Sequence, residues 1–212
     1  MINWVSELDK AVALNTAKFF NLSYFFGIAG LQNYGLFNDP NLPASITPAT
    51  KAYGGTTWIS GGVVKATANE IYLDIQDLFI QLVTQLDGLV DMKSDMVLAM
   101  SPISATALNA TNSFNVNVYK LLKDNFPNMK ISTAVQYGAA SAANSQGNTA
   151  GNFMQLIAKT VEGQQTCFCA FSEKMRQHQL IRETSAYNQK TSSGTWGAVI
   201  RISAAIAGMI GI

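Results

Sequence analysis

The chain closes on the sequence "GTWGAVIRISAAIAGMIGI", which runs from Gly194 to Ile212 and decides the class of the protein. The apolar stretch that begins at Trp196 is shorter than the about 20 residues that a helix needs to cross a bilayer. Arg201 interrupts this stretch, and a central arginine costs roughly 2.5 kcal/mol on insertion into a membrane. The ending is therefore not expected to be a membrane anchor.

The same ending alternates with a period of two. One face would carry Ile200, Ile202, Ala204, Ile206, Gly208, Ile210 and Ile212, and the other Arg201, Ser203, Ala205, Ala207, Met209 and Gly211. Such alternation is typical of strands, although strands beyond about ten residues are uncommon. We expect extended structure with a break near Ala205 or Gly208. The isoleucine face is expected to pack in a core, and the other face to contact something small.

The composition favours a self-associating subunit. Of the 212 residues, 13% are charged and the net charge is +1, whereas about a quarter of a typical chain is charged. A weakly charged surface lacks the repulsion that keeps proteins apart. No sequence-wide basic footprint for nucleic acid is present. The start, "MINWVSELDK", shows no basic region followed by an apolar core, so no signal peptide is expected.

Before residue 91 the pattern predicts helices separated by turns. Residues 1–26 are expected to be a helix, 27–44 an irregular connector and 51–66 a short strand or hairpin. Thr67 and Glu70 fit a capping box. Apolar residues from Ile71 to Val90 then recur at three- and four-residue spacing, which predicts an amphipathic helix that ends near Gly88.

After residue 94 the pattern alternates between strands and helices, which is typical of a mixed α/β unit. We expect a buried strand over 95–100, a short helix from Pro102, a helix stopped by Pro127 and a strand over 129–135. Residues 138–152, "GAASAANSQGNTAGN", lack bulky apolar groups and are expected to form a mobile surface loop. The remaining chain is expected to be mostly strands.

Cys167 and Cys169 are the only cysteines, which suits a reducing cytosol. Their spacing occurs at soft-metal sites, but a closed structural zinc site needs four ligands and the chain has one histidine. On a strand the two thiols would share a face with Phe171. We expect them to pack as small apolar residues.

His178 is a candidate general base, but no nucleophile elbow accompanies it. It lies in an alternating polar stretch and is expected on a solvent-facing or interface strand. Similarly, the glycines of "GIAGLQNYGLF" match no nucleotide-binding pattern and indicate turns. No catalytic, cofactor-binding or metal-binding residue is therefore assigned, and no cofactor is expected.

Three carboxylates, Glu70, Asp74 and Asp77, would lie along one helix face. A cation site or acid–base chemistry is possible in principle, but the ordinary interpretation is the solvated side of an amphipathic helix. A third hypothesis is that this stripe meets a basic segment of a neighbouring subunit, carrying Lys174, Arg176 and Arg182. Charge reversal at Asp74 and Asp77 would then weaken assembly.

Three stretches together resemble a known family. They are "FFGIAGLQNYGLFNDPNLP" from Phe25, "DMVLAMSPISATALNATNSFNVNVYKLLKDNFPNMKI" from Asp95, and "SSGTWGAVIRISAAIAGMIGI" from Ser192. They are similar, in this order, to segments of the major capsid proteins of tailed bacteriophages, in a branch with the Hong Kong 97-type fold. The resemblance covers the chain from about Ala11 to Ile212.

The resemblance implies an α+β fold with a spine helix, a peripheral β region and a mixed α/β axial domain. It assigns residues 1–66 to the spine helix and the peripheral connector, 67–165 to the axial domain with its loop 138–152, and 166–212 to a β-rich return to the peripheral domain. Family members carry an N-terminal arm and an extended hairpin before the spine helix, and this chain starts almost at that helix. We therefore expect a fragment, a processed form or a shortened member.

The implied function is that of a non-enzymatic subunit of an icosahedral virion capsid, assembled in the bacterial cytoplasm around DNA. Hexamers and pentamers of the chain are the expected homo-oligomers, with portal, scaffold or decoration proteins as further partners, and with no sequence-specific nucleic-acid contact and no membrane. An encapsulin-like nanocompartment shares the fold class and remains an alternative. A small hydrolase and a membrane-associated protein are weaker alternatives.

Overall fold

The computed structural model describes residues 4–212, which divide into two compact units. The first unit combines residues 4–40 with 167–200, and the second combines 41–166 with 201–212. This division differs from the sequence-based boundaries after residues 66 and 165, because both the segment 41–66 and the last twelve residues pack into the second unit. Tertiary pairing of distant segments, which composition does not record, sets these limits.

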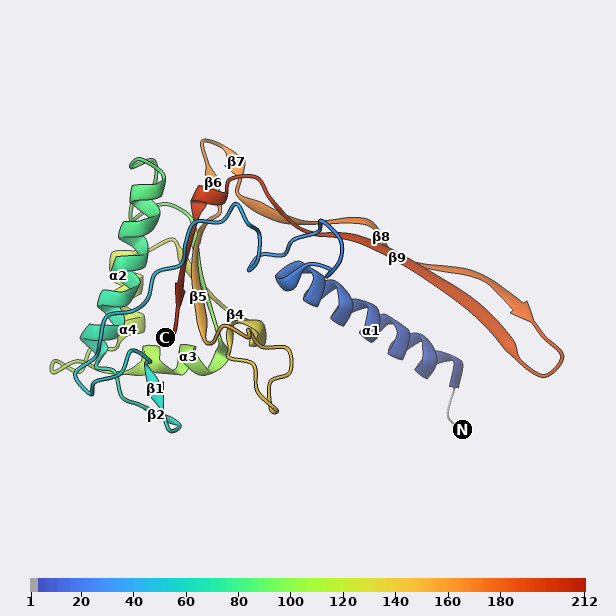
Figure 1. The fold of residues 1–212 in the computed structure, drawn as a ribbon, viewed down its shortest axis with the longest axis horizontal. Coiled ribbons are helices and arrows are strands. Elements are labelled where there is room, and N and C mark those ends of the chain that lie inside the picture. The colour runs from blue at the N-terminus through green and yellow to red at the C-terminus, as the bar shows by residue number, and fades with distance from the viewer. Residues whose placement is uncertain (1–3) are drawn as a thin grey trace. The chain divides into compact units, whose positions relative to one another are not determined.

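The first unit consists of a long helix and a long hairpin. Helix α1 (Trp4–Phe26) lies along the antiparallel strands β8 (Cys167–Arg182) and β9 (Tyr187–Ile200), as Figure 1 shows. A turn closes the hairpin, where the Glu183 amide donates to the Ala186 carbonyl. Gly27, with φ of 68°, ends the helix in the left-handed conformation that glycine tolerates best. The predicted first helix is thus confirmed over residues 4–26, its first three positions lying outside the described residues, and the glycine-rich connector is confirmed as irregular.

A four-stranded sheet forms the centre of the second unit. Its strand order is β10 (Ile206–Ile210), β5 (Phe153–Ala158), β3 (Met96–Met100) and β4 (Met129–Thr133). Strands β3 and β4 run parallel, whereas β5 is antiparallel to both of its neighbours. The predicted strands over 95–100 and 129–135 are confirmed, with the second ending two residues early.

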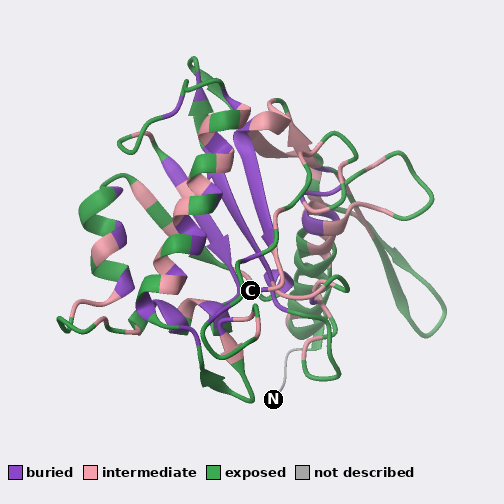
Figure 2. Ribbon diagram, turned by 60° about the vertical axis from the view of Figure 1, so that its left-hand side comes forward, coloured by how far each residue is buried: buried purple, intermediate pink, exposed green. Residues whose placement is uncertain are grey.

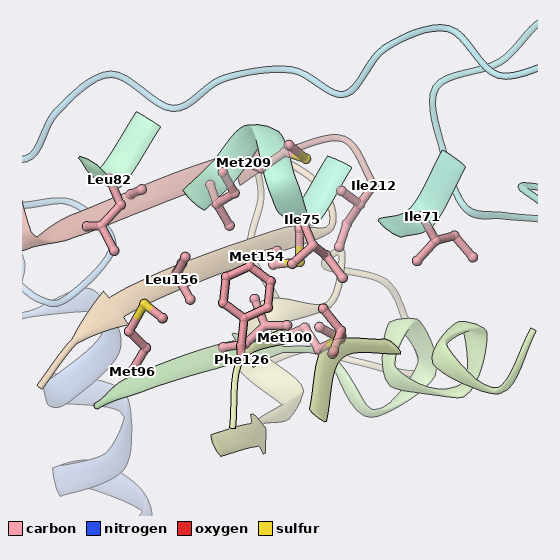
Figure 3. Packing of buried hydrophobic residues seen from close by; sticks show 14 of the residues in the cluster. Ile71, Ile75, Leu82, Met96, Met100, Phe126, Met154, Leu156, Met209 and Ile212 are labelled. Carbon is pink, nitrogen blue, oxygen red and sulfur yellow. The ribbon is translucent and has the colours of Figure 1, made fainter. Parts of the chain in front are cut away.

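Helices α2 (Ala68–Gln85) and α4 (Val118–Asn125) pack against each other over the sheet and enclose the core. Figure 2 shows the buried strands behind these helices, and Figure 3 shows the side chains that meet between them. At 25 cal/mol per Å² of apolar area, each fully buried aliphatic side chain contributes about 1.5 to 3 kcal/mol. The most enclosed members include Ile71, Ile75, Leu78, Leu82, Met96, Leu98, Met100, Leu122, Phe126, Met154 and Met209.

Local signals position the helices as the sequence predicts. The Thr67 side chain accepts from the Glu70 amide while the Glu70 carboxylate accepts from the Thr67 amide, so the capping box is present. Ser101 caps the short helix α3 (Pro102–Thr106), in which Pro102 occupies the first turn, and Asn117 caps α4. Helix α2 ends at Gln85, so Leu86 and Val90 reach the core from the turn that follows it.

The closing segment breaks as expected, and its last strand is buried on both faces. A 3-10 turn, η3 (Ser203–Ala205), separates β9 from β10. The expected face is not continuous, because the turn separates Ile200 from the isoleucines that follow it, although Ile206 and Ile212 are buried as expected. Ala207 and Met209 face the core under α2, whereas Gly208 faces Phe153 and Ser45 on the other side of the sheet.

Short elements complete the second unit. They are the hairpins β1 (Ile59–Ser60) with β2 (Val63–Val64) and β6 (Thr160–Val161) with β7 (Gln164–Gln165), and the 3-10 turns η1 (Ala107–Asn109) and η2 (Val135–Tyr137). The loop 138–152 carries no helix or strand, in agreement with its composition. The Ala140 amide donates to the Asn148 carbonyl across it, and the Asn144 side-chain amide donates to the Val135 carbonyl. Its predicted mobility stays a prediction.

Candidate assembly surfaces

The three candidate carboxylates do not form one solvated stripe. Asp74 is buried, and its carboxylate accepts from Lys51 Nζ and from Trp58 Nε1, each at 2.6 Å. The expectation that Asp74 faces solvent is wrong, because a lysine from an irregular segment reaches under the helix. Burial raises the pKa of the Asp74 carboxyl, and the two hydrogen bonds oppose that rise.

Glu70 and Asp77 do not act as partners of Asp74. The Glu70 carboxylate accepts hydrogen bonds from the Thr67 and Ala52 amides. These hydrogen bonds hold the pKa of Glu70 below the ordinary glutamate value. Of the three carboxylates only Asp77 is exposed. The hypothesised contact between the three carboxylates and a basic segment of a neighbouring subunit is therefore left without Asp74, its central residue, which is buried.

The predicted basic residues lie exposed on β8. Lys174 Nζ lies 5.5 Å from the centre of the Phe171 ring, and Arg176 lies 3.9 Å from Glu173. Both arrangements are contacts within one strand at the surface, where such pairs contribute little. Arg182 is the last residue of the strand, beside the turn.

His178 belongs to a chain of polar contacts across the hairpin. Its Nε2 lies 2.9 Å from Ser192 Oγ, and Ser192 Oγ donates to Glu173 Oε2 at 2.9 Å. In a catalytic triad the acid orients the histidine, and the histidine accepts the serine proton. Here the Glu173 carboxylate accepts the hydrogen bond of the Ser192 hydroxyl directly, so the arrangement holds the two strands together instead of activating a nucleophile.

Cys167 and Cys169 are half-buried on β8 and carry free thiols. Burial raises the pKa of both thiols. For Cys167, a hydrogen bond with the Tyr24 side chain partly offsets that rise in pKa. Burial, followed by its contacts with Cys167, raises the pKa of Tyr24. Neither thiol belongs to the buried core cluster, so their role as small apolar packing residues stays a prediction. Among residues 4–212 no three histidine, cysteine or acidic side chains gather as metal ligands would.

Helix α1 presents an apolar stripe to solvent, which sequence analysis did not identify. Side chains at three- and four-residue spacing line one exposed face: Trp4, Val5, Leu8, Val12 and Phe19. The neighbouring face contacts the hairpin, where Gln177 of β8 donates to Asp9 and the Phe20 ring lies 5.1 Å from the Phe171 ring. The signal was visible in the sequence as helical spacing, but the sequence does not tell which face the fold covers.

This stripe is unusual for a helix of an isolated protein. Trp4 and Leu8 are 70% and 63% exposed, and contiguous exposed apolar side chains mark interaction surfaces. The described residues contain no helix that is both long and apolar enough to span a bilayer. The stripe therefore stands as the principal candidate interaction surface of the first unit.

Comparisons with solved structures show the fold of the chain. The chain is similar over its whole length to a chain of the capsid of Myoviridae phage XM1, at 13% identity and a TM-score of 0.73. It spans 66% of the length of that capsid chain. A virus-like particle from Pyrococcus furiosus matches at 14% identity and a TM-score of 0.44, over 79% of this chain and 57% of that one. No curated protein sequence matches the chain.

The similarity to the phage capsid chain establishes the fold. A match to a family model shows in addition to which protein family the chain belongs. The family described as Pa193 gp26 major capsid protein matches residues 1–211. The mixed helix-and-sheet architecture and the resemblance of the three sequence stretches agree with that match. The chain belongs to the Pa193 gp26 major capsid protein family.

Proposed function

We propose that copies of this chain assemble through hexamers and pentamers into an icosahedral shell that encloses phage DNA. The observation that carries the proposal is the family match over residues 1–211. The capsid-like fold over the whole chain supports it. In this proposal the second unit is the axial domain, the first unit is the peripheral domain, and assembly occurs in the cytoplasm of the host.

Two features of the chain suit a shell. Its net charge of +1 and its charged share of 13% leave little repulsion between copies. The apolar stripe of α1 offers a surface for a neighbouring copy, since burying a large aromatic or aliphatic side chain contributes about 1.5 to 3 kcal/mol. No side chain is required to do chemistry, which agrees with the structural role that the family and fold indicate.

The proposal is tested by measuring the mass of the purified chain with light scattering and imaging the same fractions by electron microscopy. Closed particles are the expected result, and nuclease-protected DNA inside particles made in cells would support the DNA container. Particles that hold protein cargo in place of DNA would favour a nanocompartment. A chain that stays monomeric at every concentration would contradict the shell.

A further inference from the structure

An aromatic side chain of the second unit projects from a short, tightly bonded loop. Phe114 is 86% exposed. It lies at the tip of residues 111–117, between the bridged residues Thr111 and Asn117. The Asn112 carboxamide oxygen accepts from the amides of Phe114 and Val116, at 2.9 and 3.0 Å.

Backbone bonds fix the same loop. The Asn112 amide donates to the Val116 carbonyl, and the Asn115 amide donates to the Asn112 carbonyl, both at 3.0 Å. Asn115 adopts a left-handed φ of 56°, which asparagine tolerates better than most residues. The ring is thus presented to solvent by a preorganised turn, and docking it would need little further ordering.

An apolar cavity of about 460 Å³ lies elsewhere on the same unit. Trp58 and Ile212, both 1% exposed, line its interior, whereas Ile103 and Val135 line it from exposed positions at 69% and 48%. Ala139 and Ala143 from the loop 138–152 complete the apolar wall. None of the side chains that line the cavity is charged.

We propose that Phe114 of one copy inserts into this cavity of the next copy around a ring. The inference rests on the proposed shell function, since that function supplies the neighbouring copies. Neither surface carries a charged side chain, so their contact buries no unpaired charged side chain. The volume accommodates an aromatic side chain, which is the residue type that most often anchors an interface.

The two surfaces lie apart on the same unit, so Phe114 would reach the cavity of another copy and not that of its own chain. The cavity is lined by Pro102 and Ile103 at the start of α3, whereas Phe114 follows η1 at the other end of this helical segment. In Figure 1 the loop after η1 and the loop 138–152 lie at opposite sides of the second unit. A contact between two different patches of one chain is heterologous, and such contacts close into rings when the rotation permits.

A cross-linking experiment tests the contact directly. The double variant Phe114→Cys/Ile103→Cys is assembled and treated with a short bismaleimide, which joins two nearby thiols. A ladder of covalent oligomers is expected on denaturing gels. Each single variant is the control for reaction at Cys167 and Cys169, and it should give no ladder. If the double variant gives no more cross-linked product than the singles, the proposed contact is wrong.

A second variant measures how much the Phe114 side chain contributes to assembly. Phe114→Ser is expected to raise the protein concentration needed for assembly by about tenfold or more, as for loss of an interface anchor. Leu89→Ser is a matched control at a 58% exposed apolar position after α2. It should leave the concentration needed for assembly within about twofold of the parent value. Unfolding curves of both variants should match the parent chain, because both side chains are exposed.

The outcomes separate this inference from the proposed function. If the parent chain forms particles and Phe114→Ser does so at the same concentration, the Phe114 contact is wrong and the shell function stands. If the parent chain forms no assembly and the double variant gives no ladder, both are wrong. Cross-linking together with the loss of assembly in Phe114→Ser would support both.

Discussion

Lys51 Nζ lies 2.6 Å from Asp74 Oδ1, and the two side chains are each 1% exposed. Trp58 Nε1 donates to the other carboxylate oxygen of Asp74, also at 2.6 Å. Because Lys51 and Trp58 belong to the irregular segment before α2, this single carboxylate fixes that segment to the helix. The pair is therefore a structural tie inside the second unit and does not face a partner.

Removal of Asp74 is expected to destabilise the second unit strongly. Asp74→Ala should lower the free energy of unfolding by about 3 to 5 kcal/mol, because it leaves the Lys51 ammonium buried without a counter-ion. The double variant Lys51→Met/Asp74→Leu should recover most of this loss. Urea unfolding measures each value. The control is Asp77→Ala, which removes an exposed carboxylate from the same helix. It should change the free energy of unfolding by less than about 0.5 kcal/mol.

The capping box should make stability depend on acid pH. Hydrogen bonds from the Thr67 and Ala52 amides hold the pKa of Glu70 below its ordinary value. A carboxyl with a lowered pKa in the folded state stabilises fully above its unfolded pKa, which is about 4.3. That contribution is lost as the pH falls through the lower pKa of the folded state. Glu70→Gln should therefore be less stable than the parent at pH 7, and the difference should shrink on acidification. A difference that is constant with pH would contradict this account.

Gly197 of β9 should tolerate no side chain. It has a φ of 69°, and a Cβ placed there would lie 3.0 Å from both Asn33 Oδ1 and the Ser23 carbonyl oxygen. Gly197→Ala should destabilise the first unit by about 2 kcal/mol or more. Gly62→Ala, at a φ of 77° with open space around it, should cost only about 1 kcal/mol of backbone strain. Amide hydrogen exchange over residues 20–37 measures the effect locally, and exchange there should be faster in Gly197→Ala than in the parent chain.

The two thiols should react slowly in the folded chain. Burial raises the pKa of Cys167 and of Cys169, so the thiolate that reacts is scarce at neutral pH. Labelling by a thiol-specific disulfide reagent at pH 7.5 is expected to be about tenfold or more slower than in the urea-unfolded chain. The variants Cys167→Ser and Cys169→Ser separate the two rates. Equal rates in folded and unfolded chains would disprove the burial.

The apolar stripe of α1 should matter for assembly and not for folding. Leu8→Ser is expected to raise the concentration needed for assembly by about tenfold, while unfolding stays within about 0.5 kcal/mol of the parent because Leu8 is 63% exposed. Lys10→Ser removes a surface ion pair with Glu7 on the same helix and is the matched control. Light scattering across a concentration series distinguishes the two variants. Equal effects would show that the stripe is not an interface.

Local signals in the sequence determined most elements of this protein. The Thr67 capping box, Pro102 in a first turn and the spacing from Ile71 to Leu82 each specify backbone geometry through neighbours within four residues. The same holds for the break before β10 and for the lack of regular structure over 138–152. Capping, helical spacing and turn chemistry act over short range, so they can be read without the fold.

The tertiary structure decided which face of each element is covered. It brought Lys51 beneath Asp74, 23 residues away, and so turned an apparent surface carboxylate into a buried one. It buried both faces of β10, where the alternation had indicated one core face, and it left Trp4 and Leu8 in solvent. A periodic pattern defines two faces, but only the packing of distant segments determines which face each neighbour covers.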